Sequence, residues 1–125
     1  KKEPFNYLDL TGADSKDLIN EYWIVKRRVE PRYPSEAARD RVSGCVDMTL
    51  GIDSEGKLMG VKVIKSYPEG VFDNYALAAL SKWKWVPTEA NSHRIPVLTN
   101  VKMDFMVELN RNSEKFVKHC GPFDT

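Results

Sequence analysis

The stretch that decides the fold is residues 44–65, GCVDMTLGIDSEGKLMGVKVIK. In its first half apolar residues alternate with polar or small ones, which is the period of a strand that buries one face; the apolar set is Val46, Met48, Leu50 and Ile52. A turn over residues 53–56 reverses the chain, with Gly56 suited to a positive φ, and Leu58 to Lys65 returns as a second strand. The pattern predicts a β-hairpin, which needs other elements to cover it because a two-stranded ribbon is not stable alone in water.

A helix and a third strand follow the hairpin. Apolar residues at three- and four-residue steps indicate an amphipathic helix; they are Phe72, Tyr75, Ala76, Ala79, Leu80 and Trp83. Pro87 ends this helix, and residues 97–109 then alternate strictly over a long run, which predicts a strand. We therefore expect an α+β fold: a two-layer sandwich of a small antiparallel three-stranded sheet (hairpin, helix, strand) with one main helix on one face.

The residues before the hairpin contribute less regular structure. Ser35, after Pro34, can cap a short N-terminal helix, and a second short helix is possible within residues 14–21. Residues 22–29 have the pattern of a strand and are apolar enough to pair with a sheet edge. The sequence divides into a lead-in or linker (1–28), a central domain (29–109) and a C-terminal tail (110–125).

Composition restricts the function. The chain has 125 residues, about one domain, and its 19 Lys and Arg residues nearly balance 18 Asp and Glu residues, for a net charge of +1. This balance gives no electrostatic case for nucleic acid. No apolar run approaches the ~20 residues needed to cross a bilayer.

No residues with catalytic or metal-binding spacing are evident. His93 lies in a polar loop and His119 in the tail, and Cys45 and Cys120 match no zinc pattern. Isolated histidines are usually solvated, and no nucleophile–base set, carboxylate pair or phosphate loop is present. We expect neither an enzyme nor a cofactor or metal, and we interpret Trp83 and Trp85 as core residues in preference to a ligand platform.

The order of short motifs resembles one protein family. The matching residues are 29–34 (VEPRYP), 37–39 (AAR), 44–46 (GCV), 53–57 (DSEGK), 61–63 (VKV), 72–73 (FD), 76–77 (AL) and 82–87 (KWKWVP). Together they are similar to the TonB C-terminal domain, over roughly Val29 to Val107. Each motif is weak by itself, and their combined order is specific.

The resemblance implies a periplasmic domain in a Gram-negative bacterium. Such domains follow an N-terminal inner-membrane anchor that works with an ExbB/ExbD-type complex, a segment absent from this sequence. They capture the TonB box, an extended segment of TonB-dependent outer-membrane receptors, and transmit force for the uptake of iron chelates, vitamin B12 or similar cargo. We expect a monomer or a strand-exchanged dimer, because exposed strand edges permit exchange.

The expected binding site is the edge of the third strand. An extended peptide can add to an exposed edge by main-chain hydrogen bonds, and the resemblance places Glu30 and Pro31 near the bound box. Glu30 departs from the family, which often has Gln there. The predicted site residues are Glu30, Pro31, Val97, Leu98, Thr99, Asn100, Val101, Lys102, Met103, Asp104, Phe105, Met106 and Val107.

The two cysteines allow two interpretations. They are either unrelated thiols or a disulfide, and the implied periplasmic location favours the disulfide because a free thiol is vulnerable there. Strand alternation puts Cys45 on the face opposite Val46. We expect the tail to fold over that face, with Cys120 bonded to Cys45 and with Phe116 and Phe123 as a cover.

A different function remains open on sequence alone. A TonB-like envelope adaptor that binds peptidoglycan or a lipoprotein partner would share these motifs and would ignore TonB-box peptides.

Overall fold

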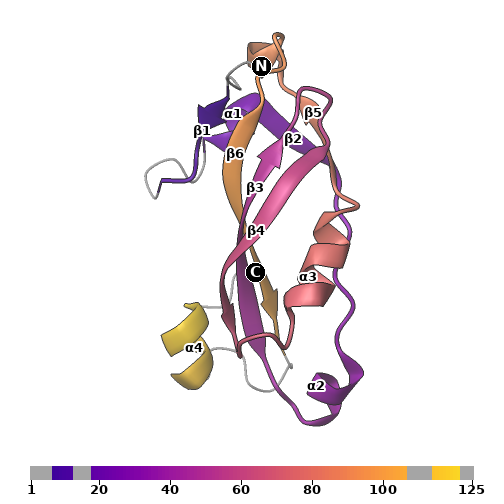
Figure 1. Cartoon of the computed structure of the whole chain (residues 1–125), viewed down its shortest axis with the longest axis vertical. Coiled ribbons are helices and arrows are strands. Elements are labelled where there is room, and N and C mark those ends of the chain that lie inside the picture. Colours follow the sequence, from indigo (N-terminus) through magenta and orange to yellow (C-terminus); the bar gives the residue numbers. More distant parts are fainter. Residues whose placement is uncertain (1–6, 13–17, 107–113, 122–125) are drawn as a thin grey trace, which may run out of the picture.

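The computed structural model describes residues 7–12, 18–106 and 114–121 (Figure 1). Its main sheet has four strands in the order β1-β6-β3-β4. These are β1 (Leu8–Asp9), β6 (Val97–Phe105), β3 (Gly44–Ile52) and β4 (Leu58–Tyr67). The central strand β3 is antiparallel to both β4 and β6, and β1 lies parallel to β6.

A second, smaller sheet lies at one end of the molecule. It consists of β2 (Trp23–Arg27) and β5 (Lys84–Pro87), which are antiparallel. The short helices α1 (Ile19–Tyr22) and η2 (Glu89–Asn91) lie at the same end, as Figure 1 shows. The hairpin turn joins the two sheets: the Trp85 N–H donates to the Gly56 carbonyl over 2.9 Å. Gly56 has φ +80°, and a Cβ there would lie 2.0 Å from the Trp85 carbonyl oxygen, so only glycine fits.

The helices cover opposite faces of the main sheet. The main helix α3 (Asp73–Leu80) packs on one face through buried Ala76, Ala79 and Leu80, whose small or compact side chains allow close approach. The helix α4 (Glu114–Cys120) packs against the other face of β3, and α2 (Ser35–Arg39) lies at the far end (Figure 1). None of the described helices has the length and apolar character to span a membrane.

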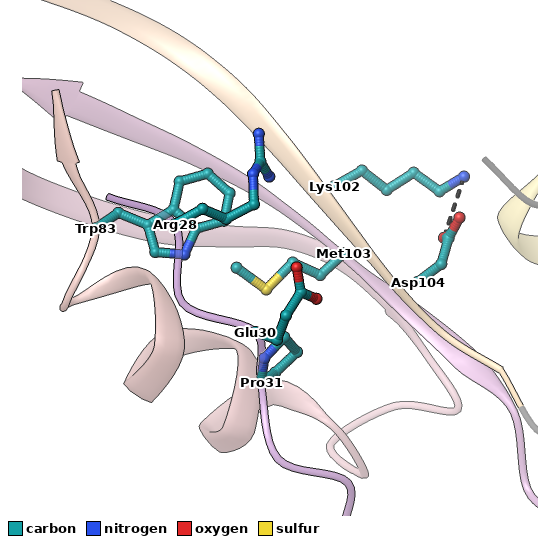
Figure 2. A pocket seen from close by; sticks show the side chains of 7 residues that line it. All are labelled: Arg28, Glu30, Pro31, Trp83, Lys102, Met103 and Asp104. Atoms are coloured by element: carbon teal, nitrogen blue, oxygen red, sulfur yellow. Dashed lines mark ion pairs between the residues drawn. The ribbon is translucent and has the colours of Figure 1, made fainter. Parts of the chain in front are cut away.

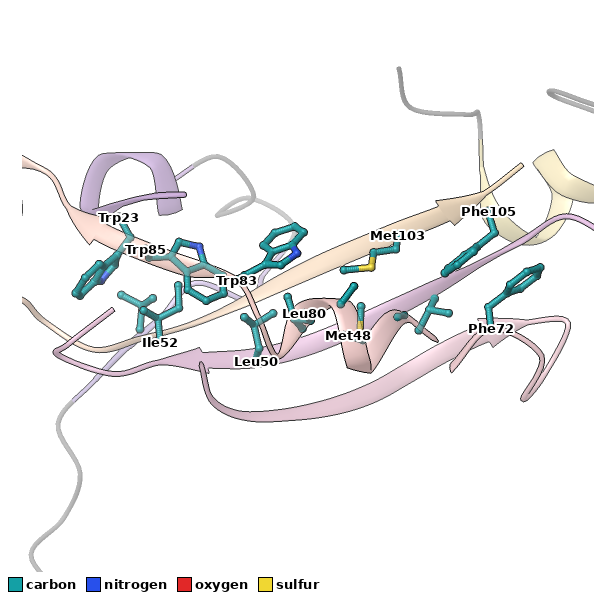
Figure 3. Close-up of a cluster of buried hydrophobic side chains, with 14 of the residues drawn as sticks. Trp23, Met48, Leu50, Ile52, Phe72, Leu80, Trp83, Trp85, Met103 and Phe105 are labelled. Carbon is teal, nitrogen blue, oxygen red and sulfur yellow. The ribbon is translucent and has the colours of Figure 1, made fainter. Parts of the chain in front are cut away.

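The core lies between α3 and the main sheet and extends to the small sheet (Figure 3). The alternating residues of β3 form its centre and are at most 1% exposed. Trp23, Trp83 and Trp85 fill one end, and Phe72 and Phe105 the other, where their rings stack at 4.3 Å. Burial of each such side chain contributes roughly 1.5–3 kcal/mol. Trp83 and Trp85 are each 4% exposed, so the prediction that they are core residues is confirmed.

The predicted α+β class is confirmed, and so are the hairpin, the main helix on one face and the short helix after Pro34. The prediction of a three-stranded sheet is wrong. The main sheet gains β1 as a fourth, parallel strand, and β2 pairs with β5 in a separate sheet. The cause is burial: Leu10 and Trp23 are 5% and 1% exposed, which anchors the segments that carry β1 and β2 on the core. The predicted strand within residues 22–29 is confirmed as β2, which pairs with β5.

The predicted disulfide between Cys45 and Cys120 is confirmed, with 5.8 Å between the two Cα atoms. It ties α4 to the face of β3 opposite the main core, where Phe116 is 2% exposed. His119 stacks on Tyr67 of β4, with ring centroids 4.0 Å apart. The tail thus covers this end of the sheet, as expected; Phe123 lies outside the described residues.

Candidate strand-acceptor edge and its pocket

The strand β6 is the most regular element at the edge of the main sheet. It pairs with β3 from Gly44↔Phe105 to Ile52↔Val97 with no shift in register. Alternate residues of a strand direct their backbone N–H and C=O groups to opposite sides. The Leu10 N–H donates to the Leu98 carbonyl from the side away from β3, so Leu98, Asn100 and Lys102 direct their backbone groups outward.

Among the described residues, pairing along this outer edge is confined to its start. β1 pairs with Val97 and Leu98 and with no later residue of β6. Among the residues that the structure describes, none makes a backbone hydrogen bond to Asn100 or Lys102 on the outer side. We call the outward N–H and C=O groups of Asn100 and Lys102 the acceptor row. Such a row can pair with an added extended chain.

A pocket of about 240 Å³ adjoins the acceptor row (Figure 2). It lies between β6 and the segment that follows β2, and the Met103 side chain points from β6 towards that segment. The residues that line it are Arg28, Glu30, Pro31, Trp83, Lys102, Met103 and Asp104. A chain that added to the acceptor row would therefore have side-chain contacts beside its backbone contacts.

The wall of the pocket opposite β6 is held in place by Trp83. Its indole N–H donates to the Val29 carbonyl over 2.9 Å. The Arg28 guanidinium lies 4.3 Å from the centre of the same ring, a cation–π contact. These contacts fix the backbone on the N-terminal side of Glu30 and Pro31, so the wall is preformed and requires little ordering when a ligand binds.

The charges around the pocket are mixed. Arg28 and Lys102 supply two cations, and Glu30 and Asp104 two anions. The Lys102 ammonium lies 3.3 Å from an Asp104 carboxylate oxygen, and the Asp104 side chain is only 8% exposed. Met103 adds an apolar contact and is 7% exposed. This combination suits a neutral or mixed peptide segment better than a strongly charged one.

The pocket lining contains two carboxylates, those of Glu30 and Asp104, and no histidine or cysteine. Within the described ranges no three His, Cys, Asp or Glu residues are grouped to hold a metal ion. The pocket and the acceptor row together have the geometry to hold an extended chain beside β6.

The structure places the predicted site residues at several different locations. Five meet at the pocket: Glu30, Pro31, Lys102, Met103 and Asp104. Leu98 and Asn100 lie on the outer edge where β1 docks, whereas the side chains of Val97, Thr99 and Phe105 are buried and Val101 packs partly against the core. Met106 packs beside the disulfide, and Val107 lies outside the described residues.

Sequence reasoning missed two pocket residues and the partial occupation of the edge. Arg28 belongs to a basic run that looks like a solvated face, and Trp83 is a core residue of which one side also lines the pocket. What links the two residues is the contact of the Arg28 guanidinium with the Trp83 ring. The sequence gives no signal for this contact, because the two residues are 55 positions apart. β1 has only two residues and no period to detect.

Fold and edge together define a small α+β domain whose strand β6 is only partly paired on its outer side by the described residues. Residues 29–107 match the family described as the Gram-negative bacterial TonB protein C-terminal, and the chain belongs to that family. It is 26% identical to Protein TonB of Vibrio cholerae over 91 residues, which are 70% of this chain and 37% of that protein. It is 31% identical to Protein TonB of Xanthomonas campestris pv. campestris over 75 residues, 60% of this chain and 34% of that protein.

Solved structures have the same fold. The solution NMR structure of the Pseudomonas aeruginosa TonB CTD matches with a TM-score of 0.60 and 22% identity, and covers 80% of this chain and 93% of that one. The TonB2 protein of Vibrio anguillarum matches with a TM-score of 0.55 and 28% identity, over 85% and 98% of the two chains. The chain spans about a third of the length of the curated relatives described above.

Proposed function

We propose that this domain is the periplasmic receptor-binding module of a TonB-type energy transducer. It captures the TonB box of TonB-dependent outer-membrane receptors by adding the box as a strand to β6. An ExbB/ExbD-type inner-membrane complex supplies the energy through an N-terminal anchor, and the receptor imports iron chelates, vitamin B12 or similar cargo. The module itself catalyses nothing.

One observation carries the proposal: beyond Leu98, the unbulged edge of β6 is not paired with any described residue, and it lies beside a preformed pocket. Backbone pairing gives affinity that depends little on the guest's side chains, while an adjoining pocket adds selectivity. One module can then serve receptors whose boxes differ in sequence. The family membership of residues 29–107 supports the same partner class.

The proposed contacts divide between backbone and side chains. Asn100 and Lys102 offer the acceptor row, and Glu30, Pro31 and Met103 contact the guest's side chains from the pocket. The wall formed by Trp83 and Arg28 does not need to move. A guest therefore loses its own conformational entropy on binding, while the pocket wall loses little.

Calorimetric titration with a synthetic TonB-box peptide from a receptor of the source organism tests the proposal. The matched control is the same peptide with proline in place of two alternate box residues, which removes the backbone donors on one side. We expect the first peptide to bind and the second to lose binding. A domain that ignores both peptides would contradict the proposal and would favour the adaptor function, in which peptidoglycan or a lipoprotein is the ligand.

A further inference from the structure

The N-terminal strand β1 docks on β6 by the type of contact that strand addition uses. The Leu8 N–H donates to the Pro96 carbonyl over 2.9 Å, and the Leu10 N–H donates to the Leu98 carbonyl over 2.8 Å. The Asn100 side-chain amide donates to the Thr11 carbonyl over 2.8 Å. The chain thus places a segment of its own on the edge proposed for the receptor.

We propose that β1 is an internal competitor, which a receptor segment must displace from β6 to pair along the whole strand. This inference rests on the proposed function, because it assigns regulation to the same edge. For a guest that pairs along the whole of β6, the apparent affinity is then the intrinsic affinity multiplied by the fraction of molecules in which β1 is undocked.

The contacts of β1 are strong enough to hold it and few enough to be exchanged. Leu10 is 5% exposed and packs in the main core, which anchors the segment. Only Leu8 and Asp9 form residue pairs with β6, however. A guest strand that pairs along the whole of β6 forms more backbone hydrogen bonds than β1 gives up, so exchange is favourable for a long guest.

The end of β1 determines where a guest starts. The Asp9 carboxylate accepts hydrogen bonds from the Thr11 amide, over 3.0 Å, and from the Thr11 hydroxyl, over 2.5 Å. This local turn ends the segment opposite Asn100. Among the described residues, none covers the backbone groups of the acceptor row while β1 is docked. A guest binds first at Asn100 and Lys102 and then replaces β1 towards Val97.

The substitution Leu8→Pro tests this competition. Proline removes the donor to Pro96 and leaves every residue of β6 and of the pocket unchanged. Leu8→Ala is the matched control, because it shortens the same side chain and keeps the N–H. We expect Leu8→Pro to bind a synthetic TonB-box peptide roughly threefold to tenfold more tightly than the wild type, and Leu8→Ala to show a smaller gain.

Amide hydrogen exchange of the wild-type domain gives a second measurement that needs no substitution. With saturating peptide the Leu8 and Leu10 amides should lose protection. If these amides stay protected while the peptide is bound, or if Leu8→Pro binds no more tightly than the wild type, β1 is not a competitor and the proposed function still stands. If neither the wild type nor Leu8→Pro binds the peptide, the proposed function fails and the competition fails with it.

Discussion

The strands β6 and β4, which lie on either side of β3, differ in how they present their edges away from β3. The pairing of β6 with β3 runs over nine residues without a shift. The pairing of β4 with β3 shifts twice, between Asp47 and Met48 and between Gly51 and Ile52. Bulges twist an edge and interrupt the regular row that a guest strand needs, so only β6 presents its groups at a constant spacing.

Side chains reinforce this difference. Lys62 and Lys65 on β4 are exposed, and neither forms an ion pair with any described residue. An added strand would have to desolvate or displace them, a common protection of edges. On β6, Lys102 is paired with Asp104 and a pocket lies alongside. The comparison teaches that the two edges differ in regularity and in adjoining walls, and these are the features on which the proposed binding site depends.

The largest expected effect comes from removing the disulfide, which alters neither edge. It joins residues 75 positions apart, so the double substitution Cys45→Ala, Cys120→Ala should lower the free energy of unfolding by roughly 2–5 kcal/mol. Denaturant unfolding measures this change. Peptide affinity well below the melting temperature should stay at the wild-type value. A large loss of affinity in the folded variant would show that α4 contributes to the β6 site.

The next effect separates the two edges directly. Lys102→Pro removes an outward donor from β6 and should weaken peptide binding by at least roughly tenfold, or about 1.4 kcal/mol. Val61→Pro is the matched control, because alternation directs the Val61 N–H outward from β4, where proline is tolerated. Calorimetric titration of both variants gives the comparison. Equal losses of affinity in the two variants would contradict specific binding at β6. A loss confined to Val61→Pro would place the peptide on β4.

A smaller effect tests the wall that distinguishes β6 from β4. Arg28→Ala removes the cation over Trp83 and should lower the free energy of unfolding by about 0.5–1 kcal/mol. Arg32→Ala, in the same segment and exposed, is the control with no ring contact among the described residues. Thermal unfolding of the pair measures the difference. Identical melting temperatures would mean that the arginine does not stabilise the wall.

The smallest effect concerns the turn that ends β1. Hydrogen bonds from the Thr11 hydroxyl and amide lower the pKa of the Asp9 carboxyl below its ordinary value. The turn is therefore stabilised at neutral pH, and this contribution is lost as the pH falls through the lowered pKa. An NMR titration of the Thr11 amide should show a midpoint below the usual aspartate value of about 3.9. Asp9→Asn should abolish that titration, and a midpoint at or above the ordinary value would contradict the geometry.

Local periodicity predicted the part of the fold that depends on neighbours in sequence. The alternation in residues 44–52 and 97–105 located β3 and β6, and the three- and four-residue spacing after Phe72 located α3. Of the small sheet, the strand within residues 22–29 was predicted, but its partner was not, because β5 has four residues and lies some 60 positions away. β1 was missed for the same reason, since its two paired residues depend on the distant start of β6.

The candidate site was predictable only where the family resemblance or a strand pattern marked it. Glu30 and Pro31 came from the resemblance, and Lys102 to Asp104 from the long alternating strand. The sequence could not separate the occupied part of the edge from the open part, because this depends on where Leu10 is buried. It also could not assign Arg28 to the pocket, because that residue acts through a ring at the end of another element.

The most direct measurement is an NMR titration of the ¹⁵N-labelled domain with the TonB-box peptide, which observes both edges in one experiment. The account predicts that the largest amide shifts and the greatest gain in exchange protection fall on Asn100 and Lys102, while Val61 and Val63 on β4 stay unchanged. Shifts concentrated on Val61 and Val63, with Asn100 and Lys102 unaffected at saturation, would contradict it.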